Sequence, residues 1–280
     1  MWGSDRGSKS EGGQKIAFTS DIRFGASRSD QYAVLGRELL ALRPEVILAH
    51  STPIAVMLHR DNPAIPIVFV SVSDPVGSGL VASLAQPGGN ATGVLQYEAS
   101  ITGKWLAMLK EISPRLTHAT FMANPKTMPF DFFLRAAETS GASLAIEVVA
   151  SRVESATEIK RGIEACAQMT NCGLLLPPDS TTVLHRDLII APANQHRVPA
   201  AYPFRIFAMS GGLMSYSTDQ VDLFRQAASY VDRILRGDKA SDLPVQAPTK
   251  YETVLNLKTA KAIGLDAPPS LLVRADDVIE

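Results

Sequence analysis

Polar side chains that can hold a small ligand follow the short apolar segments of this sequence. In an open sheet of parallel strands, ligands bind beyond the carboxyl ends of the strands, so the residues after each apolar segment are the first candidates. Their hydroxyl, amide, carboxylate and phenol groups suit a small molecule that carries a carboxylate and an ammonium group. The candidate ligand-binding residues are Ser51, Thr52, Ser73, Asp74, Tyr97, Asn124, Asp179 and Tyr202.

Each of these positions also has a purely structural interpretation. Thr52 stands just before Pro53 at a predicted helix start, where N–H groups and the positive end of the helix dipole attract a carboxylate. A threonine at a helix start can equally cap the helix. Asp74 precedes a proline and can simply form a turn. Tyr97 and Tyr202 can fill a core instead of facing a ligand. Both interpretations stay open from the sequence.

No set of residues in the sequence nominates a catalytic centre. The run His185 to Leu188 has the letters of a kinase catalytic loop, but Pro192 stands where that loop requires asparagine. No phosphate-binding glycine loop and no nucleophile elbow are found. The five histidines are scattered without the spacing of metal ligands. We therefore expect no catalytic residues, no metal and no cofactor, and we expect a protein that is not an enzyme.

Charge and hydropathy exclude two further classes of protein. The chain has 280 residues, with 27 Lys and Arg against 28 Asp and Glu, and a net charge of −1. This balance argues against nucleic acid as a partner, because such proteins normally carry a basic excess. The most apolar stretch, Ile65 to Ala85, is interrupted by Asp74, Pro75 and glycines, so no membrane span is expected. The two cysteines, Cys166 and Cys172, are expected to be small apolar residues, with a redox pair as the minor alternative.

Short apolar strands alternate with amphipathic helices through most of the chain. This alternation predicts an α/β protein with two doubly wound, parallel-sheet lobes and a ligand cleft between them. Residues 1–15 are rich in Gly, Ser and charge and are expected to be disordered. Lobe 1 is expected over 16–98, beginning with a strand at Ile16 to Phe24, and a return segment over about 215–280 joins it. Lobe 2 is expected over 99–214, entered through a crossing helix at Ile101 to Ile112.

Several long motifs resemble one known family. The run Leu39 to Gly93, the motif GKWLAMLKEISP, and the ending PPSLLVRADDVIE are similar to ABC-transporter substrate-binding proteins related to tryptophan- and tyrosine-binding proteins. The resemblance covers about Ile16 to Glu280. It implies a type I periplasmic-binding-protein fold that captures a small molecule by lobe closure and delivers it to ABC permease subunits. It also implies that Ser51 and Thr52 hold a carboxylate-like group, with Ser73 and Asp74 contributing from the same lobe. Asp179 and Tyr202 would close from the other lobe, Tyr97 would lie near the hinge, and Asn124 belongs to a segment similar to the family pattern.

The opening of the chain departs from the family pattern. Family members begin with a signal peptide, a first strand and a helix, and this sequence lacks all three, so we expect an N-terminally truncated lobe 1. The family is periplasmic, whereas this chain as written is expected to remain in the cytoplasm. A ligand-sensing regulatory module of the same fold and a non-functional truncated gene product are the alternatives. The expected ligand is an amino acid or a related carboxylate.

Overall fold

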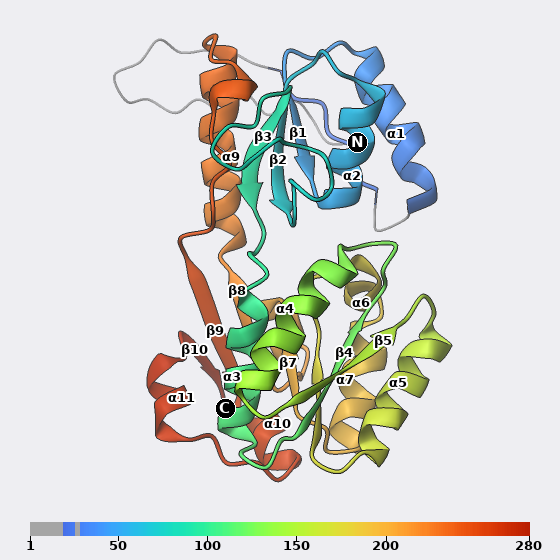
Figure 1. The fold of residues 1–280 in the computed structure, drawn as a ribbon, viewed down its shortest axis with the longest axis vertical. Coiled ribbons are helices and arrows are strands. Elements are labelled where there is room, and N and C mark those ends of the chain that lie inside the picture. The colour runs from blue at the N-terminus through green and yellow to red at the C-terminus, as the bar shows by residue number, and fades with distance from the viewer. Residues whose placement is uncertain (1–18, 26–28) are drawn as a thin grey trace.

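The chain folds into two lobes, each built around its own β-sheet (Figure 1). The structure is a computed structural model, and it describes residues 19–25 and 29–280. Lobe 1 contains a three-stranded sheet and lobe 2 a seven-stranded sheet. Helices cover both faces of each sheet, which confirms the predicted two-lobed α/β architecture.

Lobe 1 is a small parallel sheet with apolar side chains on both faces. Strand β2 lies between β1 and β3, with Ile47 opposite Ile67 and Ile67 opposite Ala91. Alternate strand residues therefore pack toward α2 on one face and toward α9 on the other. Its elements are α1 (Ser29–Ala41), β1 (Ile47–His50), α2 (Thr52–Asp61), β2 (Ile67–Val72) and β3 (Ala91–Leu95).

Lobe 2 has a larger sheet in the order β10-β9-β8-β7-β6-β4-β5. All neighbouring strands are parallel except β8 and β9, which pair antiparallel. The elements up to this antiparallel pair are α3 (Ile101–Ile112), β4 (His118–Ala123), α4 (Phe130–Ser143), β5 (Glu147–Arg152), α5 (Ala156–Gln168), β6 (Cys172–Leu175), α6 (Ser180–Leu184), α7 (Arg186–Gln195), β7 (Ala200–Tyr202), α8 (Arg205–Met209) and β8 (Met214–Thr218).

The segment predicted to return to lobe 1 divides between the two lobes. Helix α9 (Gln220–Leu235) and a short 3-10 helix (Ala240–Asp242) lie on lobe 1, where Leu223, Ala227 and Tyr230 cover Val68 and Val94. The chain then crosses back to lobe 2, where β9 pairs with the edge of β8 and β10 pairs with β9. The elements after this crossing are β9 (Tyr251–Asn256), α10 (Leu257–Ala262), α11 (Pro269–Arg274) and β10 (Asp277–Ile279).

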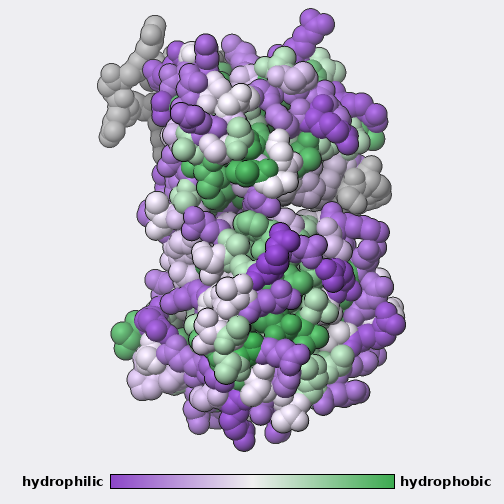
Figure 2. Space-filling view, viewed as in Figure 1, coloured by the Kyte–Doolittle hydropathy of each residue, from purple (hydrophilic) through white to green (hydrophobic). Residues whose placement is uncertain are grey.

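The surface is mainly polar, and its apolar residues form small patches. Figure 2 shows hydrophilic residues over most of one face, with apolar ones gathered in limited areas of each lobe. Among the described residues, no helix combines the length and the apolar character that crossing a bilayer requires.

The predicted strand at Ile16 to Phe24 does not form over its described part. Residues 19–25 lie outside any helix or strand, and 16–18 fall outside the described residues. A strand needs a hydrogen-bonded neighbour, and within the described residues β1, the strand at that end of the sheet, pairs only with β2. Ile22 and Phe24 are consequently exposed, at 64% and 83% of their surface. The alternating pattern is present in the sequence, but residues 19–25 do not pair with the outer edge of β1.

The expectation of two unpaired cysteines is wrong. Cys166 and Cys172 form a disulfide, with their Cα atoms 5.6 Å apart. Cys166 lies in the last turn of α5 and Cys172 begins β6, so a tight turn brings the two thiols together. The separation of the two cysteines along the sequence did not indicate this pairing, because it differs from that of a C-x-x-C motif.

The disulfide is expected to stabilise lobe 2. Closing a loop of six residues removes chain entropy from the unfolded state, worth about 2 kcal/mol. Reduction with dithiothreitol should therefore lower the thermal midpoint by several degrees, measured by circular dichroism. The double variant Cys166→Ser/Cys172→Ser is the control, and its midpoint should not respond to dithiothreitol. An unchanged midpoint after verified reduction would contradict this role.

Candidate functional site

The carboxyl ends of the lobe 1 strands face lobe 2. Figure 1 shows β1, β2 and β3 ending toward lobe 2, with α6 and the loop before α4 at the end of lobe 2 that faces them. Ser51 follows β1, and Ser73 and Asp74 follow β2. Asn124 follows β4, and Asp179 follows β6. Both sheets thus direct their strand ends, and most of the predicted residues, to the region between the lobes.

Backbone strain is concentrated at the lobe 1 side of this region. Seven non-glycine residues of the described chain have a positive φ. Four of them follow the C-terminal ends of helices, where a left-handed residue is a common way to end a helix. The other three are Ser51 (φ 80°), Ser71 (φ 58°) and Asp74 (φ 49°), all at strand ends beside lobe 2. Strain of this kind persists where the surrounding structure enforces it, and it gathers at binding sites.

Ser51 lies at the start of α2, and its hydroxyl makes no hydrogen bond within the part of the chain that the structure describes. Its backbone, at φ 80° and ψ 151°, lies in a region that glycine occupies almost exclusively. The Ser51 N–H donates to the Val70 carbonyl at 3.0 Å, which holds the residue against β2. The Ser51 side chain makes no capping hydrogen bond, although it occupies the N-cap position. The hydroxyl and the N-terminal N–H groups of α2 are therefore available to an anion.

Thr52, Ser73 and Asp74 mainly hold the loop after β2. The Thr52 hydroxyl accepts from the Ser73 N–H at 3.0 Å and donates to the Ser73 carbonyl at 3.3 Å. Ser73 is buried, with 5% of its surface exposed. The Asp74 carboxylate accepts from the Gly77 N–H at 2.8 Å, which closes a turn. These contacts correspond to the structural interpretation of Thr52 and Asp74, and they fix the geometry around Ser51.

In lobe 2, Asp179 is the centre of a buried polar cluster. Its carboxylate accepts from the N–H groups of Thr181, Thr182 and Asn124 at 3.0–3.2 Å, and from the Thr127 hydroxyl. Only 3% of Asp179 is exposed. Burial raises the pKa of this carboxyl, and the four donors act against that rise. Asp179 therefore caps α6 and joins it to the loop after β4.

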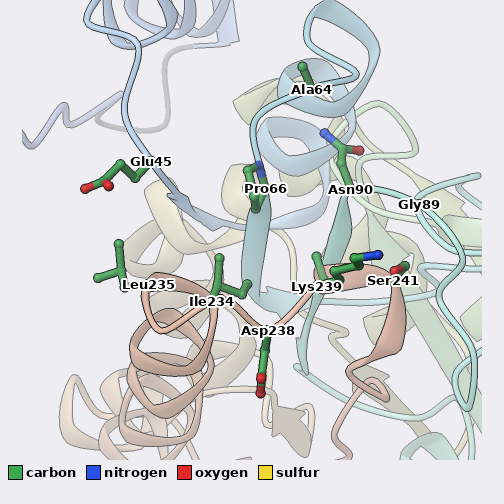
Figure 3. Close-up of a pocket in the computed structure, with 12 residues that line it drawn as sticks. Glu45, Ala64, Pro66, Gly89, Asn90, Ile234, Leu235, Asp238, Lys239 and Ser241 are labelled. Atoms are coloured by element: carbon green, nitrogen blue, oxygen red, sulfur yellow. The ribbon is translucent and has the colours of Figure 1, made fainter.

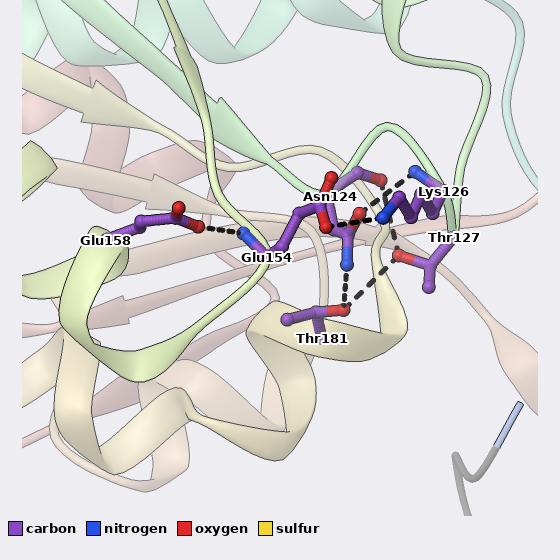
Figure 4. A network of polar contacts seen from close by, with 6 residues as sticks. All are labelled: Asn124, Lys126, Thr127, Glu154, Glu158 and Thr181. Carbon is purple, nitrogen blue, oxygen red and sulfur yellow. Dashed lines mark hydrogen bonds and ion pairs between the residues drawn. The ribbon is translucent and has the colours of Figure 1, made fainter.

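Asn124 extends this cluster along the loop before α4. Figure 4 shows its side-chain amide donating to the Thr181 hydroxyl, at 3.0 Å, while its oxygen accepts from the Lys126 N–H at 2.9 Å. Lys126 forms an ion pair with Glu154 at 2.6 Å. Thr127 was not among the predicted residues. The only sequence signal for it is the Asn-Pro turn three residues before, which folds the loop back over Asp179.

The two predicted tyrosines lie in cores. Tyr97 is 1% exposed, and its hydroxyl donates to the Pro203 carbonyl. Tyr97 also packs edge-on against Trp105, with ring centroids 5.4 Å apart, so it belongs to the connection between the lobes. Tyr202 is fully buried and stacks on Phe207 at 4.9 Å, and its hydroxyl has no partner in the described chain. The structure groups neither ring with the strand-end clusters.

A hollow lies at the other end of lobe 1. It has a volume of about 470 Å³ and is lined by Glu45, Pro66, Asn90 and the segment after α9 (Figure 3). These residues precede β1, β2 and β3, so the hollow sits at the amino ends of the strands. Ligands of open parallel sheets bind at the opposite ends, so we do not assign the solute site here. Within residues 19–25 and 29–280, no group of His, Cys, Asp and Glu side chains is arranged to hold a metal.

Comparisons with known proteins agree with this architecture. The chain is 26% identical over 223 residues to the tyrosine-binding protein of Clostridioides difficile, a match that covers 80% of this chain. The match spans 64% of that relative, which is less than two thirds of its length.

Two solved structures are similar in fold. A conserved domain protein from Vibrio cholerae is 26% identical with a TM-score of 0.84, and the match covers 90% of this chain and 84% of that one. An ABC domain from Streptococcus pneumoniae, solved in complex with L-Trp, is 24% identical with a TM-score of 0.79 and the same coverage. The sequence profile described as ABC transporter substrate binding protein matches residues 8–279. The chain belongs to the ABC transporter substrate binding protein family.

Proposed function

We propose that this chain is the solute-binding component of an ABC importer, that it captures an amino acid or related carboxylate between its lobes, and that it delivers this solute to a membrane permease. One observation carries the proposal: the strands of lobe 1 end toward lobe 2, and hydroxyl, amide and carboxylate side chains follow the strand ends of both sheets there. Two-lobed α/β proteins close around ligands at this position by hinge motion. The names of the relatives, a tyrosine-binding protein and an L-Trp complex, favour an aromatic amino acid.

Within the proposal, the two lobes have different roles toward the solute. The Ser51 hydroxyl and the start of α2 hold the carboxylate. In lobe 2, the cluster around Asp179 and Asn124 contributes polar groups, and Asp179 keeps this surface rigid by capping α6. The protein binds its solute without transforming it, since no nucleophile with an adjacent base lies among these strand-end residues.

A location outside the reducing cytosol is part of this proposal. Disulfides persist in oxidising compartments such as the bacterial periplasm and are rare in cytosolic proteins. The Cys166–Cys172 bond supports such a location for this chain. The expectation of a cytoplasmic chain came only from its first residues, which carry no further conclusion about where the protein works.

The proposal predicts stabilisation by its ligand. A solute at a hundred times its dissociation constant adds about 2.7 kcal/mol to the free energy of unfolding. For a chain of this size the thermal midpoint should then rise by several degrees. We would measure melts with each of the twenty amino acids and confirm any hit by calorimetric titration. A panel without a single shift would contradict the amino-acid assignment.

Replacement of Ser51 by glycine should change stability and affinity in opposite directions. Glycine adopts φ 80° and ψ 151° freely, so Ser51→Gly should be about 1 kcal/mol more stable without ligand. Loss of a hydroxyl that bonds a charged group should weaken binding roughly ten-fold or more. Ser51→Ala is the matched control: it also removes the hydroxyl but keeps the strain. Unweakened binding by Ser51→Gly would remove this hydroxyl from the site.

Asp179 should matter to folding even without ligand. In Asp179→Asn an amide nitrogen replaces one carboxylate oxygen and leaves two donors unsatisfied, at roughly 1–3 kcal/mol each. We expect a loss of about 2–4 kcal/mol in urea unfolding of the ligand-free protein. Asp131→Asn, which breaks an exposed ion pair with Arg152, should cost less than about 1 kcal/mol. If both variants are equally stable, capping does not explain Asp179.

A further inference from the structure

A chain of side-chain hydrogen bonds runs through the connection between the lobes. The Thr218 hydroxyl accepts from the Gln96 side-chain amide at 2.9 Å and from the Gln220 side-chain amide at 3.0 Å. Gln96 lies on the first crossing of the chain between the lobes, and Thr218 and Gln220 flank the second crossing. One hydroxyl therefore ties two crossings together.

Thr218 and its partner Gln96 are both buried. Thr218 is 2% exposed and Gln96 is 3% exposed. Loss of the partner of a buried amide is destabilising, because no water replaces the lost bond. The Thr218 N–H also donates to the Tyr97 hydroxyl at 3.4 Å, so the same residue holds the first crossing at two points. The crossings keep all these bonds only within a narrow range of positions relative to each other.

The same chain of bonds reaches the strand end that faces lobe 2. The Ser71 hydroxyl donates to the Gln220 side-chain oxygen at 3.2 Å. Ser71 is the extra residue of a bulge in β2, because Val70 pairs with Val94 while Val72 pairs with Leu95. Its φ of 58° directs the chain into the loop that contains Ser73 and Asp74. Bulges near binding sites commonly redirect a side chain in this way.

We propose that Thr218 is a positioning residue whose hydroxyl, through Gln96 and Gln220, sets the angle between the lobes, and that Gln220 couples this angle to the loop after β2. The inference rests on the proposed function. None of the three side chains needs to contact the solute. An intact chain of bonds limits the arrangements of the free protein, so closure around a solute loses less conformational entropy.

The test removes the hydroxyl without changing the shape of the side chain. Thr218→Val should change the small-angle scattering profile of the ligand-free protein toward a broader range of lobe arrangements. It should also weaken binding of L-tyrosine or L-tryptophan by between roughly two-fold and thirty-fold. Thr218→Ser, which keeps the hydroxyl, should behave as the unmodified protein. Thr253→Val is the control, because Thr253 is also buried, at 7% exposure, and takes no part in the bonds of Thr218, Gln96, Gln220 and Ser71.

Two more variants keep the inference testable if Thr218→Val does not fold. Gln220→Met breaks the bonds of Gln220 to Thr218 and to Ser71, Ser71→Ala breaks only the bond between Ser71 and Gln220, and each variant should bind more weakly. Because they break one chain of bonds, the double variant should lose little more than the stronger single variant. Thr218→Val with unaltered scattering, or with altered scattering and unaltered affinity, overturns the inference.

The experiments distinguish a failure of the proposed function from a failure of the role assigned to Thr218. If the unmodified protein binds neither L-tyrosine nor L-tryptophan, the assignment of an aromatic amino acid fails. The scattering comparison of ligand-free Thr218→Val and Thr253→Val then still decides whether Thr218 sets the angle between the lobes. Equal profiles would overturn that role, and a change confined to Thr218→Val would support it.

Discussion

The arrangement of the two lobes depends on three chain crossings that are hydrogen-bonded to one another. Gln246 exchanges backbone bonds with β3, donating to the Gly93 carbonyl and accepting from the Leu95 N–H, both at 2.9 Å. Asp219 and Lys250 join the second and third crossings through a backbone bond of 3.0 Å. Each lobe is built from separate stretches of the sequence, so the chain passes between the lobes three times. Rotation about these three crossings is the motion that a two-lobed binding protein requires.

The two sides of the proposed site are stabilised differently. On lobe 1 the backbone is strained at Ser51, Ser71 and Asp74, and few side-chain bonds surround the Ser51 hydroxyl. On lobe 2 the groups around Asp179 are saturated with hydrogen bonds and buried. A strained surface with free donors and a rigid, satisfied surface are both compatible with binding. The first supplies free donors, and the second holds its shape while the lobes move.

The small sheet of lobe 1 needs helix α9 to cover one of its faces. A three-stranded sheet with α1 and α2 alone would leave one face open. Leu223, Ala227 and Tyr230, spaced at helical intervals, bring a segment from far along the sequence onto that face. The chain therefore leaves lobe 2, completes lobe 1 and returns, and this route creates the second and third crossings.

The sequence alone determined the fold class and the strand ends that face the other lobe, because buried parallel strands and amphipathic helices leave strong local patterns. It also placed Ser51, Asn124 and Asp179 at such ends. Three features depended on tertiary structure: the pairing of Cys166 with Cys172, the burial of the Tyr97 and Tyr202 rings, and the failure of residues 19–25 to form a strand. Each depends on which distant segment becomes a neighbour, and periodicity reports only the local chain.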